Sequence, residues 1–388
     1  MLHIYNRFPV VFDYGKRTSL FDVNGKEYLD FGSGIGVMAF GYGDKEFEDA
    51  VTAQVKKLFH TSNLYYHTAL ADAAAAVKEA SGLDKVFFTN SGAETIEGAI
   101  KTAKKYAYKK KGHAGCEIIA AQNSFHGRTV GAVAVTGNDH YREPFYPLMD
   151  GVRFGTYNDL ESFKALVKDN TCAIIVETVQ GEGGIRPAEK DFLVGLRKLC
   201  DEKDMLLILD EVQCGMGRCG SMYTYMQYGI KPDVLCTAKA LGGGIPVGAF
   251  VVNDNVAANS LEPGDHGTTY GGNPIACAAV SASVSIIKNR NLIENVNENA
   301  PYLEKILEGF VDKYDFIQER RGRGYMQGLQ LDASVPVGGI VSNALSKGLI
   351  LLSAGGNVIR MLPPLISGKD EFDHMEKILD SVLQEITV

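Results

Sequence analysis

The feature of the sequence that most restricts its fold is an alternation of short apolar runs with longer amphipathic segments. Six runs read KVFFT, CEIIAA, CAIIVET, MLLILDE, DVLCTA and GAFVV. Amphipathic segments such as Glu94–Lys111 and Lys190–Lys203 separate several of them and are predicted to be helices. Strands that are apolar on both faces belong in a mostly parallel sheet with helices on both sides, so the sequence predicts an α/β fold.

The two ends of the chain are predicted to form a second, smaller α/β unit. The stretch RTSLFDVNGKEYLDF reads as a hairpin, because apolar residues alternate along it and the NG pair supplies the turn. From about residue 290, helices alternate with strands in RGYMQGLQLD and NVIRMLPPL. We therefore expect a large domain over residues 60–290 and a small domain built from residues 1–59 together with 291–388.

Charge and composition disfavour several classes of protein. A net charge of −8 argues against nucleic acid and anionic membranes as partners, since both select basic surfaces. The start lacks the apolar core of a signal peptide, and no apolar run approaches the roughly 18 residues that cross a bilayer. The seven cysteines form no C-x-x-C motif, which favours reduced thiols in the cytoplasm. The eight histidines show no metal-binding spacing, so no metal site is expected.

The stretch TNSGAETIEGAIKTAKKY begins a helix directly after a predicted strand. Ser91 suits the helix N-cap and Glu94 completes a capping box, so a purely structural role is one interpretation. The alternative is that the small residues Gly92 and Ala93 leave the helix N-terminus open to an anion, which its free N–H groups and its dipole attract. Phosphate is the anion that we expect at Ser91–Ala93.

The loop NSFHGRTVGAVAVTG follows the next predicted strand and contains an aromatic ring and a cation. Open α/β sheets bind their ligands at the carboxyl ends of the strands. Phe125 is therefore a candidate for stacking on a planar ligand, and Arg128 is a candidate for gripping a carboxylate with two hydrogen bonds. A core phenylalanine beside a surface arginine is the structural alternative.

An acid, Asp210, ends the buried strand MLLILDE. A carboxylate in that position needs a partner. The protonated ring nitrogen of a heteroaromatic cofactor would supply one, and a salt bridge to Arg218 is the alternative.

The glycines in GMGRCG raise a rival class, because they match the dinucleotide-binding motif G-x-G-x-x-G of NAD-dependent oxidoreductases. In that motif the strand turns directly into the helix, whereas Glu211–Cys214 intervene here. The ribose-binding acid of such a site ends the second strand, whereas Asp233 precedes its strand. Both features weigh against the dinucleotide interpretation.

A single cation, Lys239, follows the apolar strand DVLCTA, and three glycines come shortly after it. Lysine is seldom buried without a partner, and desolvation lowers its pKa. A neutral amine is a nucleophile that condenses with aldehydes. Pyridoxal 5′-phosphate (PLP) offers an aldehyde to Lys239, a ring nitrogen to Asp210, a ring face to Phe125 and a phosphate to the Ser91–Ala93 turn. We therefore expect PLP as the cofactor and Lys239 as the catalytic residue.

Nine motifs follow one another along nearly the whole chain: SGIGVMAFGYG, HTSNLYY, TNSGAE, FHGRT, VQGEGG, LDEVQCGMGRCG, TAKALGGGIPVGAF, HGTTYGGNP and IRMLPPL. In this order they resemble the class III aminotransferases of PLP fold type I. The resemblance implies an aspartate aminotransferase-like fold and a homodimer with active sites at the interface. Within the family the motifs are most similar to the acetylornithine group. That likeness implies reversible amino transfer from N2-acetyl-L-ornithine to 2-oxoglutarate in arginine biosynthesis.

The resemblance also implies roles for individual residues. Lys239 would bind the aldehyde and carry the proton between substrate and cofactor, while Asp210 would pair with the ring nitrogen. Further cofactor contacts are implied for Ser91, Gly92, Ala93, Phe125, Glu211, Val212, Gln213 and, toward the partner subunit, Thr269. Substrate contacts are implied for Arg128, Thr268, Glu182 and Arg360, the last two as an ion pair that masks the arginine for one substrate only. A structural salt bridge is the alternative for that pair.

Some positions depart from the family pattern, namely Thr178, Cys214, Cys219 and the stretch GYGDKEF. None of these positions carries the expected chemistry, but the departures leave the identity of the amino donor open. Succinylornithine, ornithine, 4-aminobutyrate and a carrier-linked lysine are alternative donors. A non-catalytic α/β binding protein is a third class, and it would bind ligands without turnover.

Overall fold

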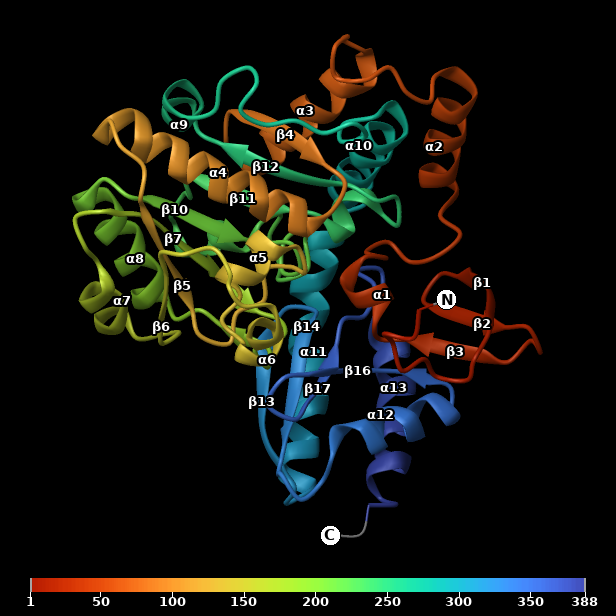
Figure 1. The fold of residues 1–388 in the computed structure, drawn as a ribbon. Helices are drawn as coiled ribbons and strands as arrows, with labels where there is room; N and C mark the ends of the chain where they lie inside the picture. Colours follow the sequence, from red (N-terminus) through yellow and green to blue (C-terminus); the bar gives the residue numbers. More distant parts are fainter. Residues whose placement is uncertain (1, 387–388) are drawn as a thin grey trace.

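In the computed structural model, which describes residues 2–386, the largest sheet has seven strands in the order β4-β12-β11-β10-β7-β5-β6 (Figure 1). The strands are β4 (Lys85–Thr89), β5 (Glu117–Ala121), β6 (Val152–Gly155), β7 (Thr171–Glu177), β10 (Leu206–Asp210), β11 (Val234–Thr237) and β12 (Gly248–Val252). All neighbours pair in parallel except β12, which is antiparallel to β11 and β4. The mostly parallel sheet predicted from the apolar runs is confirmed.

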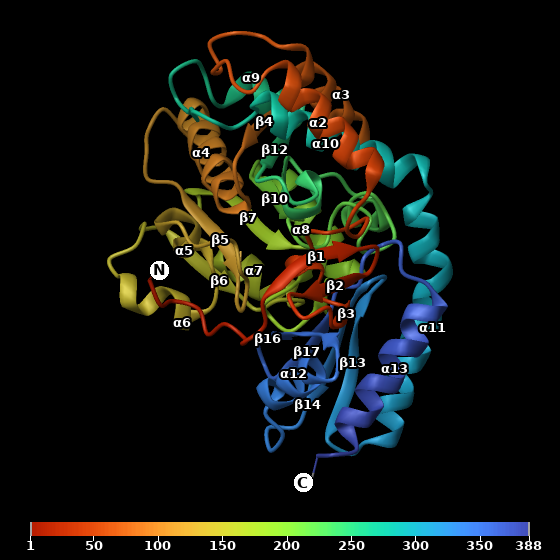
Figure 2. The same cartoon turned by 90° about the vertical axis from the view of Figure 1, so that its right-hand side faces the viewer.

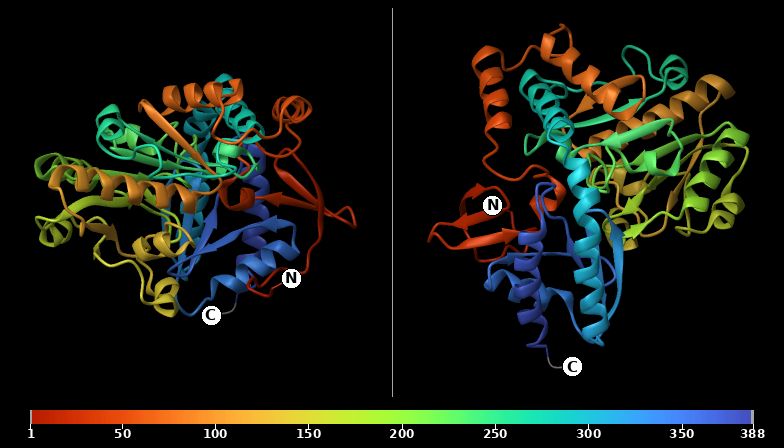
Figure 3. Two further views of the ribbon diagram at one scale, coloured as in Figure 1. Left: turned by 45° about the horizontal axis from the view of Figure 1, so that its top comes forward. Right: turned by 180° about the vertical axis from the view of Figure 1, so that it is seen from behind.

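Helices cover both faces of this sheet, because alternate residues of each buried strand point to opposite sides. In β10, Leu206 and Ile208 pack with α4 (Gly92–Lys111), whereas Leu207 and Leu209 face the other side. That side is covered by α3 (Thr68–Ser81), α8 (Lys190–Lys203) and α10 (Pro274–Asn289). Each such buried aliphatic side chain stabilises the fold by about 1.5–3 kcal/mol, and the two layers are visible in Figure 3.

Shorter elements connect and flank these layers. They are α1 (Ser33–Gly36), α2 (Lys45–Lys57), α5 (Val130–Val135), α6 (Asp139–Arg142), η1 (Glu143–Phe145), α7 (Leu160–Leu166), β8 (Val179–Gln180), β9 (Arg186–Pro187), η2 (Thr224–Tyr228), η3 (Lys239–Gly242) and α9 (Asp254–Asn259). None of the helices in residues 2–386 combines the length and the apolar character that a membrane crossing requires.

The remaining strands form two four-stranded sheets within the described residues. One contains β1 (Phe12–Lys16), β2 (Ser19–Asp22), β3 (Glu27–Asp30) and β15 (Leu349–Ile350), and the other contains β13 (Ile317–Arg323), β14 (Met326–Leu331), β17 (Val358–Met361) and β16 (Leu352–Ala354). The helices α11 (Leu292–Lys313), α12 (Val337–Ser346) and α13 (Lys369–Leu383) accompany them (Figure 2). β3 pairs in parallel with β15, so the two ends of the chain share one sheet.

The predicted hairpin is confirmed, because β2 pairs antiparallel with β3. Its turn contains Gly25 with φ 80°, a left-handed conformation that glycine adopts without strain. The segment after β10 contradicts the dinucleotide interpretation, because residues 211–220 form successive turns rather than a helix. Asp233 lies just before β11 and pairs with Arg197 at 2.7 Å.

The topology brings the chemistry-bearing loops to one edge of the large sheet. β4, β5, β7, β10 and β11 run in the same direction, so their carboxyl ends share that edge. β10 and β11 are direct neighbours, with Asp210 opposite Cys236. The segments that follow these strands therefore converge on the crevice expected for an open α/β sheet.

Candidate active site

A cavity of about 400 Å³ opens at the carboxyl edge of the large sheet. Its lining includes most of the residues that the sequence singled out: Ser91, Gly92, Ala93, Phe125, Arg128, Glu182, Asp210, Val212, Gln213 and Lys239. The lining is contributed by segments far apart in the sequence, and only the strand order brings them together.

Lys239 occupies a short 3₁₀ turn directly after β11. Its backbone has φ 48°, which is uncommon for a residue with a side chain and is typical of strained functional positions. Burial lowers the pKa of the Lys239 amine below the usual lysine value, while the nearby Asp210 carboxylate opposes that shift. The site therefore favours the neutral, nucleophilic form of the amine more than water does.

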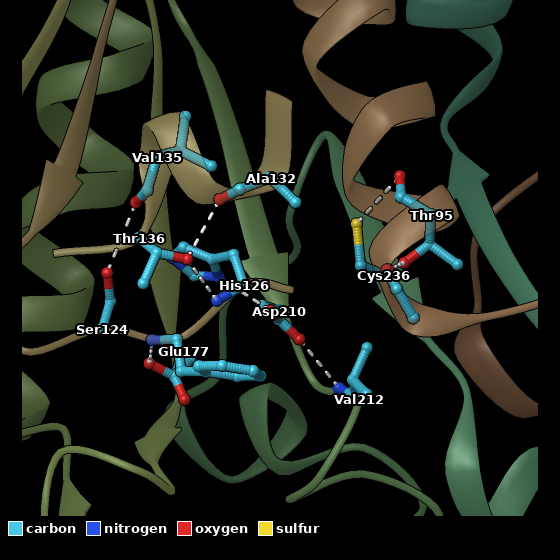
Figure 4. A network of polar contacts seen from close by, with 12 residues as sticks. Thr95, Ser124, His126, Ala132, Val135, Thr136, Glu177, Asp210, Val212 and Cys236 are labelled. Carbon is cyan, nitrogen blue, oxygen red and sulfur yellow. Dashed lines mark hydrogen bonds and ion pairs between the residues drawn. The ribbon is translucent and has the colours of Figure 1, made fainter. Parts of the chain in front are cut away.

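Asp210 enters the same cavity from the end of β10, and it is buried. One carboxylate oxygen accepts the Nδ1–H of His126 at 2.8 Å and the other accepts the backbone N–H of Val212 at 3.0 Å, as Figure 4 shows. The alternative salt bridge to Arg218 does not form, since that guanidinium donates to the carbonyl oxygens of Pro363 and Tyr325. The carboxylate is thus fixed in the cavity wall and still has accepting capacity for a cation.

The geometry at the N-terminus of α4 agrees with both interpretations of TNSGAE, helix capping and anion binding. The Ser91 side chain caps the helix by accepting the N–H of Glu94 at 3.2 Å, and Glu94 accepts the N–H of Asn90 at 2.6 Å. Gly92 lies so close to the opposite wall that an added Cβ would come within 2.9 Å of Val212 Cγ1. The small residues thus keep the first N–H groups of the helix accessible to an anion in the cavity.

The loop after β5 places Phe125 and Arg128 on the cavity wall. The backbone N–H of Phe125 donates to Glu177 Oε2 at 3.1 Å. This bond anchors the backbone from which the Phe125 ring projects. Arg128 is exposed at the mouth of the cavity. Its place on the wall makes its guanidinium available to a ligand.

Glu182 and Arg360 form an ion pair at the edge of the cavity. Arg360 is buried and comes from β17, and its Nη1 also lies 3.3 Å from Gln213 Oε1. Glu182 is the member that lines the cavity, and its side chain is a quarter exposed. A ligand therefore meets the carboxylate first and reaches the arginine only if the pair opens.

Sequence reasoning missed two residues of this site, His126 and Glu177. His126 is buried against Asp210, and its Nε2 has no hydrogen-bond partner among residues 2–386. Glu177 ends β7 directly opposite Asp210 in the sheet, and burial raises its pKa to about 7. The rule that selected Asp210, an acid at the end of a buried strand, also selects Glu177.

Besides Arg360, three predicted site residues lie outside the cavity lining. The Glu211 carboxylate points the other way and accepts hydrogen bonds from Thr178 Oγ1 at 3.0 Å and from Tyr225 N at 2.7 Å, contrary to the expected contact with the cofactor. Thr268 is linked to the site through Asn90, whose Nδ2 donates to Thr268 Oγ1 at 3.2 Å. Thr269 is exposed beside the loop of residues 60–63.

The sequence profile of one protein family, described as Aminotransferase class-III, matches residues 3–383. The chain belongs to this family. Among curated relatives, the acetylornithine aminotransferase of Methanocaldococcus jannaschii is 46% identical over 385 residues, covering 99% of this chain and 96% of the relative. That of Aquifex aeolicus is 43% identical, with 99% of each chain covered.

Solved structures of other aminotransferases share the fold. Ornithine aminotransferase from Toxoplasma gondii matches with a TM-score of 0.94 at 29% identity, covering 99% of this chain and 92% of that one. N-acetylornithine aminotransferase from Stenotrophomonas maltophilia matches with a TM-score of 0.85 at 32% identity, covering 98% and 97%. The predicted fold class is thereby confirmed.

Class-III aminotransferases depend on PLP, and a second T. gondii structure is described with that cofactor at its active site. The cavity of this chain fits the group on its own geometry. It presents an amine of lowered pKa, a fixed carboxylate, an aromatic ring and a helix N-terminus kept open by Gly92. These are the complements of an aldehyde, a ring nitrogen, a ring face and a phosphate. PLP is accordingly the cofactor of this enzyme.

Proposed function

We propose that this class-III aminotransferase transfers an amino group reversibly from N2-acetyl-L-ornithine to 2-oxoglutarate. The products are N-acetyl-L-glutamate 5-semialdehyde and L-glutamate, a step of arginine biosynthesis. One observation carries the proposal: Lys239 and Asp210 share a single cavity in a chain that is 46% identical to a curated acetylornithine aminotransferase over almost its full length. Ornithine is the second candidate donor, because the T. gondii ornithine enzyme has a TM-score of 0.94 with this chain.

When bound, PLP supplies an aldehyde that holds the amino group in transit and a ring that takes up electron density from the reacting carbon. In our proposal Lys239 binds the cofactor and then acts as general base and general acid at that carbon, a task suited to an amine of lowered pKa. Asp210 holds positive charge on the ring nitrogen, Phe125 covers the ring, and Ser91–Ala93 hold the phosphate. Arg128 binds the carboxylate of the donor at the mouth of the cavity.

A panel of amino donors tests the substrate assignment. The purified holoenzyme is mixed with acetylornithine, succinylornithine, ornithine or 4-aminobutyrate, and the first half-reaction is followed by the loss of cofactor absorbance under single-turnover conditions. We expect the highest rate constant divided by Kd with acetylornithine. A higher value with ornithine or 4-aminobutyrate would move the chain to that activity while leaving the aminotransferase assignment intact.

We further propose that Glu182 and Arg360 discriminate between the two substrates. Acetylornithine carries one carboxylate, whereas glutamate and 2-oxoglutarate carry two. The Glu182 carboxylate neutralises the buried Arg360 guanidinium when no substrate carboxylate reaches it. The second carboxylate of glutamate can replace Glu182, because a buried arginine left without a counter-charge is costly.

Replacing Glu182 tests this discrimination. In Glu182→Ala the Arg360 guanidinium is free, so we expect a lower KM for glutamate and a higher KM for acetylornithine. The specificity ratio should shift by at least about tenfold toward glutamate. Steady-state kinetics of both half-reactions measure this ratio. Glu189→Ala serves as a control, since Glu189 precedes α8 and is exposed away from the cavity. Equal changes in both KM values would indicate a purely structural ion pair.

We also propose that the enzyme is a homodimer whose Thr269 serves the site of the partner subunit. An apolar surface is formed by the loop before α3 and by Tyr270, with Phe59, Leu64, Tyr65, Tyr66 and Tyr270 exposed. Asn63 ties the two segments together through hydrogen bonds to the carbonyls of Thr268 and Gly271. Exposed apolar patches of this kind mark interfaces. If a second copy of this chain covers the patch, Thr269 can contact the cofactor phosphate in the site of that copy.

Subunit complementation tests the shared site. Lys239→Ala and Thr269→Glu should each be inactive as homodimers, the second because a carboxylate repels phosphate. When the two variants are co-expressed with different tags, each mixed dimer regains one intact site. Random pairing should then restore about a quarter of the wild-type activity. If the mixture stays as inactive as its parts, Thr269 does not act across the interface.

We retain the division into a large domain of residues 60–290 and a small one of residues 1–59 plus 291–388 as part of the proposal. The pairing of β3 with β15 supports a small domain built from both ends.

A cytoplasmic location is likewise proposed. All seven cysteines are free and buried, which suits a reducing compartment.

A further inference from the structure

Arg128 is held by an aromatic ring that does not line the cavity. The guanidinium carbon of Arg128 lies 3.9 Å from the centroid of the Tyr141 ring, and 5.3 Å from that of Phe125. Among residues 2–386, no salt bridge or side-chain hydrogen bond of Arg128 is formed. The ring of Tyr141 is therefore the main fixed contact of this cation, at a distance typical of a cation–π interaction.

Tyr141 also supports the second wall residue of the same loop. Its ring meets the Phe125 ring edge to face, with centroids 5.6 Å apart and planes at 79°. Tyr141 sits in the four-residue helix α6, which Asn138 caps by accepting the N–H of His140 at 3.1 Å. It is half-buried, and it does not appear among the residues that line the cavity within the described chain. One ring thus contacts both the expected carboxylate-binding arginine and the expected ring-stacking phenylalanine from outside.

We propose that Tyr141 is a positioning residue that orients Arg128 for the carboxylate of the amino donor. A long arginine side chain at an exposed cavity mouth would otherwise sample many rotamers, and ordering them on binding reduces affinity. Stacking on Tyr141 limits those rotamers beforehand and leaves the N–H groups of the guanidinium free, because the ring engages its face. The inference rests on the proposed role of Arg128 in donor binding.

Arg128 contacts the ring of Tyr141 and not its hydroxyl. The variants are therefore chosen to remove the ring while a control keeps it. Tyr141→Phe keeps the ring and should behave as wild type. Tyr141→Leu keeps apolar bulk but removes the π face, so we expect KM for acetylornithine to rise by about two- to thirtyfold, with kcat little changed. Tyr146→Leu is the matched control: Tyr146 lies on the same segment but contacts Arg142, whose Nη2 donates to its hydroxyl at 2.6 Å.

A double-mutant cycle with Arg128→Ala completes the experiment, with KM, kcat and bound PLP measured for each variant. We expect Arg128→Ala to raise the donor KM without loss of PLP, and Tyr141→Leu to add nothing in that background. If Arg128→Ala raises KM and Tyr141→Leu does not, or if their effects are additive, the role of Tyr141 is overturned while the proposed function stands. If Arg128→Ala itself leaves KM unchanged, the assignment of the donor site fails instead.

Discussion

Lys239→Ala is expected to abolish transamination, with kcat reduced by at least about 10⁴-fold. In the proposed mechanism, this side chain supplies both the amine that binds the cofactor and the group that moves a proton at the reacting carbon. No other lysine lines the cavity within residues 2–386, so none can take over either task. The measurement is the steady-state rate of glutamate formation from acetylornithine and 2-oxoglutarate, together with the PLP content after purification.

Two further variants show whether the loss is specific. Lys239→Arg keeps a long cation, but a guanidinium stays protonated at neutral pH and should be nearly as inactive. Lys231→Ala removes an exposed lysine whose Nζ donates to the carbonyl of Gly82 at 3.2 Å, and it should retain normal turnover. A Lys239→Ala enzyme that works at the wild-type rate would refute the catalytic assignment.

Asp210→Asn is expected to reduce kcat by about 10²- to 10³-fold while the protein stays folded. The amide keeps the size of the side chain and an oxygen that can accept the hydrogen bond from His126, so packing changes little. The negative charge is lost, and with it the group that in our proposal stabilises a protonated ring nitrogen on the cofactor. Steady-state kinetics and a thermal melt of the holoenzyme separate the chemical effect from a loss of stability.

Asp191→Asn is the control for this charge. Asp191 is exposed in the first turn of α8, so its loss should leave kcat unchanged. Asp210→Glu restores the charge but displaces the carboxylate from His126 and Val212, so we expect an intermediate kcat. A fully active Asp210→Asn enzyme would mean that the carboxylate serves the fold and not the reaction.

Six of the seven strands of the large sheet could be predicted because they are apolar on both faces. Two of the missed strands lack this signature. β6 is only partly buried, and β13 carries several charged residues along an edge of its sheet. The direction of β12 could not be predicted from the sequence either, because the run GAFVV is equally apolar whether the strand lies parallel or antiparallel to its neighbours.

The site could be predicted where a residue type alone implies a need. Asp210 and Lys239 are charges at the ends of buried strands, and each requires a partner. The family resemblance implies a cofactor contact for Glu211 as well as for Asp210, yet adjacent residues of an extended segment point to opposite sides. It therefore lies in a separate network with Thr178 and Tyr225. The contact of His126 with Asp210 depends on how a loop folds across neighbouring strands, which no local pattern encodes.

The pairing of β3 with β15 has a consequence for how the molecule is made. Leu29 leaves the ribosome early, whereas its partner Leu349 is among the last residues to be synthesised. Until then the edge of β3 exposes unpaired backbone groups, which are a template for contacts with other chains. Closing such a distant pair is also intrinsically slow. Nascent or truncated chains that lack the C-terminal part should accordingly be the species most prone to aggregate.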